Sequence, residues 1–275
     1  MVNPTSPITQ LQTHWSLSRM PFTKNIPIQA LSAHPSHLEA VARIGWVAAQ
    51  RQIGLIAGEV GAGKTVAVRA ALATLEPARH LPIYVPDPTI GPRGIYTQVV
   101  EALGGTPHRW TTTVQRRASD LLAGELDERG RVPVLIIDEA HLLSNQALDA
   151  LRMLTNSDMD ATATFCLLLV GQPTLRRKLK MAVLTALDQR IATRYTITPM
   201  NPEETTGYIN AHLAWAGRTD TLFTSDAINQ LHHASRGYPR AVNVLATAAM
   251  IAAYTTTKPI IDLECVDTAI TETNQ

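Results

Sequence analysis

The sequence is poor in cysteine, carries almost no net charge and contains no long apolar run. Its two cysteines, Cys166 and Cys265, lie far apart and lack the spacing of metal ligands, and the apolar run around Cys166 predicts a reduced core residue. With a net charge of +1, any nucleic-acid-binding surface has to be local. No stretch approaches about eighteen consecutive apolar residues, and the polar residues 1–6 do not form a signal peptide. We expect a cytoplasmic protein without a membrane segment.

The 275 residues suffice for one large domain and one small one. A hydrophobic content of 45% with 17% charged residues is ordinary for a soluble globular protein. Several prolines within residues 1–30 predict an extended arm rather than a packed element. Apolar residues at helical spacing then predict a helix over residues 36–51, with Ser36 as its N-cap.

Strand-like apolar runs alternate with helical patterns through the middle of the chain, which is typical of a doubly wound parallel α/β sheet. The predicted strands are 53–57, 82–86, 133–137, 165–170 and, near the end, 194–198. Only helical patterns follow Pro199, at 202–216, 224–236, 239–255 and 262–272. We therefore expect an N-terminal arm (1–35), an α/β core (36–199) and a small all-helical domain (200–275).

A phosphate-binding loop is predicted between the first strand and the helix that follows it. Residues 58–65 match the pattern G-x-x-x-x-G-K-[ST] at every fixed position, and this strand–loop–helix context favours the loop over a chance glycine-rich turn. Lys64 would reach the β- and γ-phosphates, and the Thr65 hydroxyl would ligate Mg²⁺. The predicted nucleotide contacts are Gly58, Glu59, Val60, Gly61, Ala62, Gly63, Lys64, Thr65 and Val66.

A second motif places two carboxylates after the apolar run Val134–Ile137. Such a run suits a central parallel strand, and open α/β sheets bind ligands at the carboxyl ends of their strands. Asp138 would hold Mg²⁺, and Glu139 would polarise the attacking water as the general base. A strand followed by a polar turn is the alternative, but the pairing with the phosphate loop favours a site that binds and hydrolyses a nucleoside triphosphate.

Further candidate site residues lie at Gln172, at Arg190 or Arg194, and at Arg240. Gln172 follows the strand at 165–170 and either contacts the γ-phosphate and water or simply forms a turn. Arg190 or Arg194 would supply charge to a neighbouring subunit's transferring phosphate, or pair with a surface carboxylate. Arg240 follows Pro239 at a helix start, where the dipole disfavours a cation, and this favours an anionic partner such as the nucleotide phosphate.

Two clusters of basic residues could meet a phosphate backbone. Trp110 beside the first cluster suits stacking on a base, and closely spaced arginines suit duplex phosphates. Solvated helix faces are the alternative for both. The candidate DNA contacts are Arg109, Arg116 and Arg117 in the first cluster and Arg176, Arg177 and Lys178 in the second.

Together these segments resemble the ExeA-type branch of the AAA+ ATPases over nearly the whole chain. The resemblance rests on Pro21-Phe22, the phosphate loop, Ile136–Leu143, Leu169–Leu175, Gln189-Arg190-Ile191 and Gly237–Arg240. It implies a P-loop AAA+ core, a parallel αβα sandwich, followed by a helical lid, and a homo-oligomer, either a ring or a helical filament, with ATP between subunits.

The resemblance also assigns roles to single residues. Lys64 and Thr65 would contact phosphate and Mg²⁺, while Asp138 and Glu139 would be the metal and base residues. Gln172 would lie at sensor 1, Arg190 would be the finger acting in trans, and Arg240 would be the sensor 2 arginine. His141 departs from the pattern, because an acidic or amide residue is more frequent there.

Two functions are compatible with this resemblance. ExeA-like secretion proteins carry a membrane span and a cell-wall-binding domain after the ATPase, and the 275 residues end without either. We therefore expect an ATP-dependent, DNA-binding regulator of transposition, similar to accessory ATPases of the TnsC, MuB and IstB kind. It would assemble on double-stranded DNA with ATP, recruit or activate a transposase, and disassemble on hydrolysis. The alternative is a secretion-type or signalling ATPase that acts on protein partners without DNA.

Overall fold

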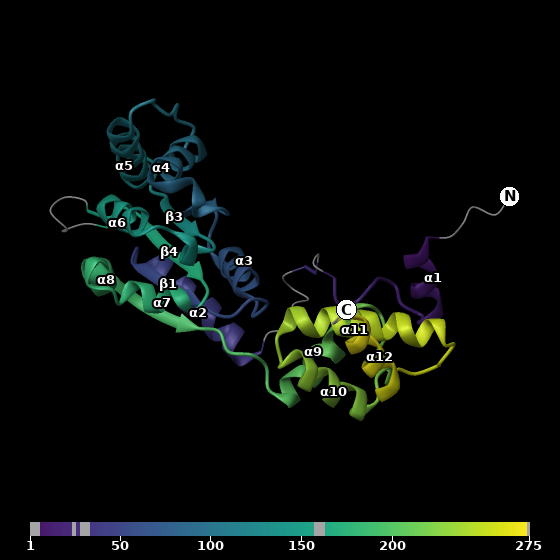
Figure 1. Ribbon diagram of the computed structural model, residues 1–275. Helices are drawn as coiled ribbons and strands as arrows, with labels where there is room; N and C mark the ends of the chain where they lie inside the picture. The colour runs from purple at the N-terminus through teal and green to yellow at the C-terminus, as the bar shows by residue number, and fades with distance from the viewer. Residues whose placement is uncertain (1–5, 24–25, 28–33, 157–162, 274–275) are drawn as a thin grey trace. The chain divides into compact units, whose positions relative to one another are not determined.

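The computed structural model describes residues 6–23, 26–27, 34–156 and 163–273, which divide into two units (Figure 1). The core unit comprises His37–Val60 and Lys64–Ile197, and the helical unit comprises the described residues up to Ser36, Gly61–Gly63 and those from Thr198 onward. Among the described residues, no helix is both long and apolar enough to cross a membrane.

The core unit is built on a five-stranded sheet in the order β2-β3-β4-β1-β5, with every neighbouring pair parallel. The parallel α/β prediction is therefore confirmed. β1, β3 and β4 are apolar and almost wholly buried because helices cover parallel sheets on both faces. The strands are β1 (Ile53–Ala57), β2 (His80–Val85), β3 (Val132–Ile137), β4 (Cys166–Gly171) and β5 (Ile191–Thr196).

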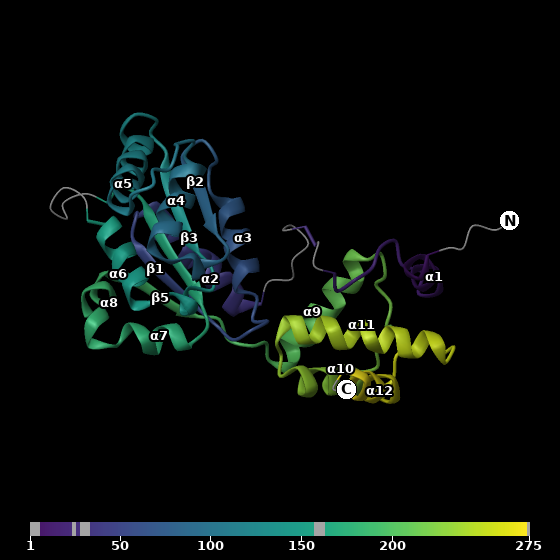
Figure 2. The same cartoon turned by 45° about the horizontal axis from the view of Figure 1, so that its top comes forward.

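Helices alternate with these strands along the chain (Figure 2). The buried apolar faces of α4, α5 and α6 join the strands in one hydrophobic core. The helices are α2 (Pro35–Ala49), α3 (Lys64–Thr74), α4 (Gly91–Ala102), α5 (Thr111–Asp127), α6 (Asn145–Leu154), α7 (Thr174–Leu179) and α8 (Thr185–Arg190), with short 3-10 turns η2 (Pro88–Ile90), η3 (Ala140–Leu142) and η5 (Ala182–Leu184).

The N-cap predicted for α2 is wrong by two positions. The helix begins at Pro35, since the fixed φ of proline suits a first helical residue, and Ser36 lies inside it. The Ser36 hydroxyl instead accepts a hydrogen bond of 2.9 Å from the Thr198 backbone N–H.

The helical unit has a hydrophobic core of its own. Local signals set its helix starts: Asn201 and Glu204 form a capping box, Thr224 caps the next helix, and Pro239 begins the third. This agrees with the four helices predicted after Pro199. The helices are α9 (Pro202–Trp215), α10 (Ser225–Ser235), α11 (Pro239–Thr255) and α12 (Leu263–Thr273), together with α1 (Pro7–His14) near the N-terminus.

The expectation of an extended arm is wrong for the described N-terminal residues. Ser6 caps α1, and Pro7 occupies its first position, where the missing N–H costs nothing. Trp15 and Phe22 are buried in the core of the helical unit. Ser18 donates two hydrogen bonds of 2.8–2.9 Å, from its N–H and its hydroxyl, to the Ala216 carbonyl. The predicted domain boundaries at 35/36 and 199/200 stay a prediction.

Candidate nucleotide-binding site

The predicted phosphate loop connects the end of β1 to the start of α3. β1 ends at Ala57 and α3 begins at Lys64, so residues 58–63 form the turn between them. Gly61 and Gly63 have φ values of 81° and 89°, which an L side chain adopts only with strain. Consecutive peptide N–H groups in such a turn, followed by a helix N-terminus, favour an anion such as phosphate.

Lys64 is held at the mouth of this loop by its own backbone. Its Nζ donates hydrogen bonds to the Gly58 carbonyl (2.9 Å) and the Glu59 carbonyl (3.0 Å), and the residue is only 7% exposed. Burial lowers the pKa of Lys64, and the carboxylates of Glu139, Asp138 and Glu59 oppose that shift. A buried ammonium held by neutral carbonyls gains from an anionic acceptor, because charge-assisted hydrogen bonds are the stronger ones.

Asp138, at the end of β3, lies against the start of α3. The Thr65 hydroxyl donates to Asp138 Oδ2 at 3.0 Å, and the Glu139 backbone N–H donates to Oδ1 at 2.8 Å. A hydroxyl and a carboxylate that converge suit Mg²⁺, which takes few protein ligands and completes its shell with phosphate oxygens and water. Among the described residues, no group of three or more His, Cys, Asp or Glu could hold a metal ion. Thr65 and Asp138 are therefore the residues that would hold the metal.

Glu139 lies in the turn after β3 and has an unusual backbone conformation. Its φ of 48° lies in the left-handed region, which is uncommon for a non-glycine residue and often marks a functional site. Its side chain is 46% exposed, and Oε2 lies 3.3 Å from His141 Nδ1. An accessible carboxylate beside a predicted metal residue suits a general base for water. His141, the departure from the pattern noted above, therefore lies next to that base.

Gln172 follows the last residue of β4, the strand that lies between β1 and β3. The phosphate loop, Asp138 and Gln172 thus follow three adjacent strands at one edge of the sheet. A Cβ on Gly171 would lie 3.1 Å from the His141 backbone nitrogen, so glycine permits the close approach of β4 to the turn after β3. The sensor role of Gln172 stays a prediction.

The three candidate arginines have different surroundings. Arg190 ends α8 and donates to the Thr155 hydroxyl (3.2 Å) and to the Asn156 side-chain oxygen. Arg194 lies in β5 and pairs with the Asp188 carboxylate at 3.2 Å. Arg240 is the second residue of α11, and its peptide N–H donates to the Gly61 carbonyl at 3.3 Å within the helical unit.

The two basic clusters do not form one surface. Figures 1 and 2 both show α5 and α7 at opposite ends of the core unit. In the first cluster Arg109 stacks 4.9 Å over the ring of Trp110, which is 59% exposed. Exposed arginines on α5 complete this cluster, namely Arg116 and Arg117.

Two side chains of the second cluster donate hydrogen bonds to other residues of the core unit. Arg176 donates to the Thr196 hydroxyl at 2.8 Å, and Lys178 donates to the Leu143 carbonyl. Arg177 is exposed. The first cluster is therefore the better candidate for a nucleic-acid contact, which stays a prediction for both.

Sequence reasoning missed one residue of the site, Tyr84. Its phenol donates a hydrogen bond of 2.8 Å to Asp138 Oδ2. Burial, followed by the hydrogen bond to Asp138, raises the pKa of Tyr84 to about 12. A tyrosine one residue before the end of a strand was the available signal, but the sequence does not say which strand lies beside it.

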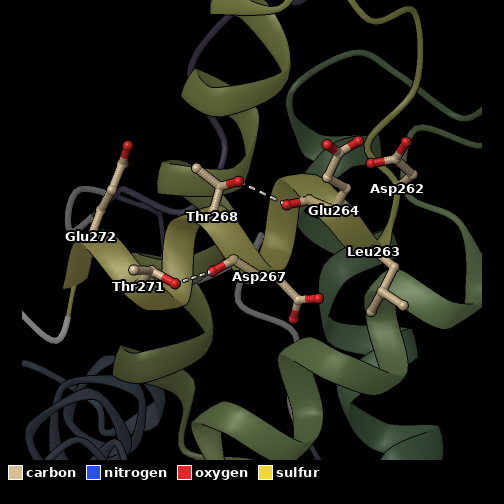
Figure 3. Close-up of a pocket in the computed structure, with 7 residues that line it drawn as sticks. All are labelled: Asp262, Leu263, Glu264, Asp267, Thr268, Thr271 and Glu272. Carbon is tan, nitrogen blue, oxygen red and sulfur yellow. Dashed lines mark hydrogen bonds between the residues drawn. The ribbon is translucent and has the colours of Figure 1, made fainter.

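A separate hollow of about 680 Å³ lies along α12 in the helical unit (Figure 3). The hydroxyls of Thr268 and Thr271 donate to backbone carbonyls of the same helix, at 2.9 Å each. The lining of this hollow contains no residue of the predicted nucleotide site. It consists of Asp262, Leu263, Glu264, Asp267, Thr268, Thr271 and Glu272.

Part of the chain matches a known protein family. Residues 48–179 match the family model described as an AAA domain, a range that includes the phosphate loop, Asp138, Glu139 and Gln172. Over 251 residues the chain is 30% identical to general secretion pathway protein A of Aeromonas hydrophila. That match covers 87% of this chain and 44% of the relative, so the chain spans less than half of the relative's length.

Two solved structures are similar to this chain. For the Aeropyrum pernix ORC1 protein in complex with DNA, the TM-score is 0.68 at 18% identity, covering 90% of this chain and 68% of that one. For the Drosophila ORC bound to DNA, the TM-score is 0.71 at 16% identity, and the match covers 100% of this chain and 68% of that one. At these identities the likeness shows the fold alone: a parallel α/β core followed by C-terminal helices.

Proposed function

We propose that this chain, whose residues 48–179 carry an AAA domain, is an ATPase that acts on protein partners as a homologue of general secretion pathway protein A. One structural observation carries the catalytic part: Thr65, which follows Lys64 in the phosphate loop, donates a hydrogen bond of 3.0 Å to Asp138 of the second motif. The identity to the secretion protein over most of the chain supports the choice of protein partners.

The chain's own residues divide the reaction among them. Lys64 and the loop N–H groups bind the phosphates, and Thr65 and Asp138 would hold Mg²⁺, which when bound would supply positive charge to the phosphate oxygens. Glu139 takes a proton from water as the water oxygen bonds to the γ-phosphorus. The bond from that phosphorus to the bridging oxygen breaks, and ADP leaves with the electron pair. Gln172 orients the water.

The two arginines outside this arrangement complete the proposal. In a homo-oligomer, either a ring or a helical filament, Arg190 reaches the γ-phosphate bound by the neighbouring copy. An arginine acting in trans accelerates phosphoryl transfer by about 10³–10⁵-fold. Arg240, near the start of α11, responds to the bound phosphates as sensor 2.

The known relatives favour the alternative, an ATPase that acts on protein partners, over the expected transposition regulator. Neither solved structure named above is a transposition protein, and the curated relative is a secretion protein. A transposase partner therefore has no support from these relatives. One observation keeps duplex DNA as a second candidate partner: the exposed stack of Arg109 on Trp110, with Arg116 and Arg117 exposed on α5.

Two assays test the proposal together. The first measures ATP hydrolysis with Mg²⁺; hydrolysis is expected from the native chain and not from Lys64→Ala. The second measures binding to a labelled random duplex without nucleotide, with ADP, and with a non-hydrolysable ATP analogue plus Mg²⁺. We expect hydrolysis without nucleotide-dependent DNA binding.

Each assay has an outcome that contradicts part of the proposal. Absent hydrolysis by the native chain would overturn the ATPase. Tight binding to duplex DNA only with the ATP analogue would contradict the proposal of protein partners and make DNA the proposed partner. Such binding should weaken by about 0.9 log units per log unit of salt for each phosphate contacted.

A further inference from the structure

The carboxylate of Asp138 accepts hydrogen bonds from three donors. Thr65 and the Glu139 N–H belong to the two nucleotide motifs. The third donor is the Tyr84 phenol, which belongs to neither motif and makes the 2.8 Å bond to Oδ2. Oδ2 therefore accepts from Tyr84 and Thr65 at the same time, at 2.8 and 3.0 Å.

The register of the sheet explains how Tyr84 reaches this oxygen. Tyr84 on β2 pairs with Ile136 on β3, and the Asp138 N–H continues the ladder by donating to the Val85 carbonyl at 3.0 Å. Side chains two residues apart on a strand lie on the same face, so Asp138 shares the face of Ile136 and hence of Tyr84. The long phenol side chain then spans the remaining distance along the strand.

We propose that Tyr84 is a positioning residue of the ATPase site: its phenol holds the Asp138 carboxylate in the orientation that meets the Thr65 hydroxyl and the Mg²⁺ of the substrate. The proposal rests on the proposed function. A carboxylate oxygen has two lone pairs, so Oδ2 would keep the phenol hydrogen bond on one while the other, which accepts from Thr65 in this structure, would turn to the metal. Tyr84 thus acts through Asp138 and touches neither ATP nor the reacting atoms.

The energetic consequence follows from how such partners act in metal sites. Groups that hydrogen-bond a metal ligand restrict its rotation, and their loss typically weakens metal binding by about 10–100-fold. Phosphate binding by Lys64 and the loop amides does not pass through Asp138. Loss of the phenol should therefore weaken the Mg²⁺-dependent part of nucleotide binding and spare the rest.

The test is Tyr84→Phe, measured by titration of a fluorescent ATP analogue in EDTA and in increasing Mg²⁺. The expected result is an unchanged affinity in EDTA and a Mg²⁺ midpoint raised by about tenfold or more. Tyr96→Phe is the matched control, because Tyr96 is in the same unit and its phenol donates to the Ala150 carbonyl at 3.0 Å. This control should titrate like the native chain.

A second variant shows whether the effect passes through Asp138. In an Asp138→Asn background, Tyr84→Phe should add little, because groups that act through one partner are not additive. A native Mg²⁺ midpoint in Tyr84→Phe, or a full additional loss in the double variant, would overturn the proposal. Absence of analogue binding by the native chain would instead overturn the nucleotide site itself.

Discussion

The Thr65 hydroxyl lies 3.0 Å from Asp138 Oδ2, although 73 positions of sequence separate the two residues. Thr65 follows β1 and Asp138 follows β3, and these strands are not neighbours, since β4 lies between them. The contact therefore crosses the carboxyl edge of three strands. It joins the two sequence motifs into one site.

Lys64→Ala should abolish ATP binding. The variant removes the ammonium that would make charge-assisted hydrogen bonds to phosphate, each worth about 1.5–3 kcal/mol, so affinity should fall by about a hundredfold or more. Calorimetric titration with ATP measures the loss. Lys180→Ala is the control, because Lys180 is an exposed lysine that pairs with Asp188. Native affinity in Lys64→Ala would remove the loop from the nucleotide site.

Glu139→Gln should bind ATP but hydrolyse it slowly. The amide keeps the size of the side chain and cannot take a proton from water, so turnover should fall by about 10²–10⁴-fold. Single-turnover hydrolysis, with affinity measured in parallel, separates the two effects. Glu128→Gln, at the exposed glutamate that follows the last residue of α5, should leave both unchanged. Equal losses in affinity and turnover would argue against a general base.

Arg190→Ala should bind ATP and lose turnover, because its proposed site of action is on the neighbouring copy. Mixing it with Lys64→Ala tests this directly. Each variant alone should be inactive, but the Lys64→Ala copy would supply Arg190 to the intact phosphate loop of the other, so activity should return in the mixture. Normal hydrolysis by Arg190→Ala alone would make Arg194 the next candidate, despite its pairing with Asp188.

Stability should fall in acid through His212. The Phe22 N–H donates to its Nδ1 at 3.3 Å, the ring is 1% exposed, and burial lowers the pKa of His212 from 6.5 to about 4. The unfolded chain therefore binds the proton more readily than the folded chain. The contribution of neutral His212 to the free energy of unfolding is therefore complete above pH 6.5 and is lost as the pH falls toward 4. The loss is on the order of 3 kcal/mol in all.

Urea unfolding of the native chain and of His212→Gln at pH 7.5 and pH 5 measures this dependence. The variant should lose part of the difference between the two pH values. Burial also lowers the pKa of His34 and His232, so the comparison is between chains and not between absolute stabilities. His233→Gln, at the exposed histidine that follows His232, should show the same difference in stability between the two pH values as the native chain. An unchanged difference in His212→Gln would contradict the prediction.

The parts of the fold that local patterns specify were predictable from the sequence. Capping signals at Asn201, Thr224 and Pro239 set helix starts within the segment itself, and the helices after Pro199 agree with their prediction. Ser36 was misplaced because a nearby proline competed for the same helix start. The N-terminal residues were misjudged because the pattern of prolines says nothing of a distant core that buries Trp15 and Phe22.

Local patterns were enough to predict the phosphate loop, the buried strand before Asp138 and the parallel α/β class, because each depends on residues within a few positions of one another. The folded molecule was needed to show that β4 lies between β1 and β3, that Tyr84 reaches Asp138, and that Phe22 meets His212 at a separation of 190 positions. Strand order and long-range packing depend on the whole core, and no local pattern encodes them.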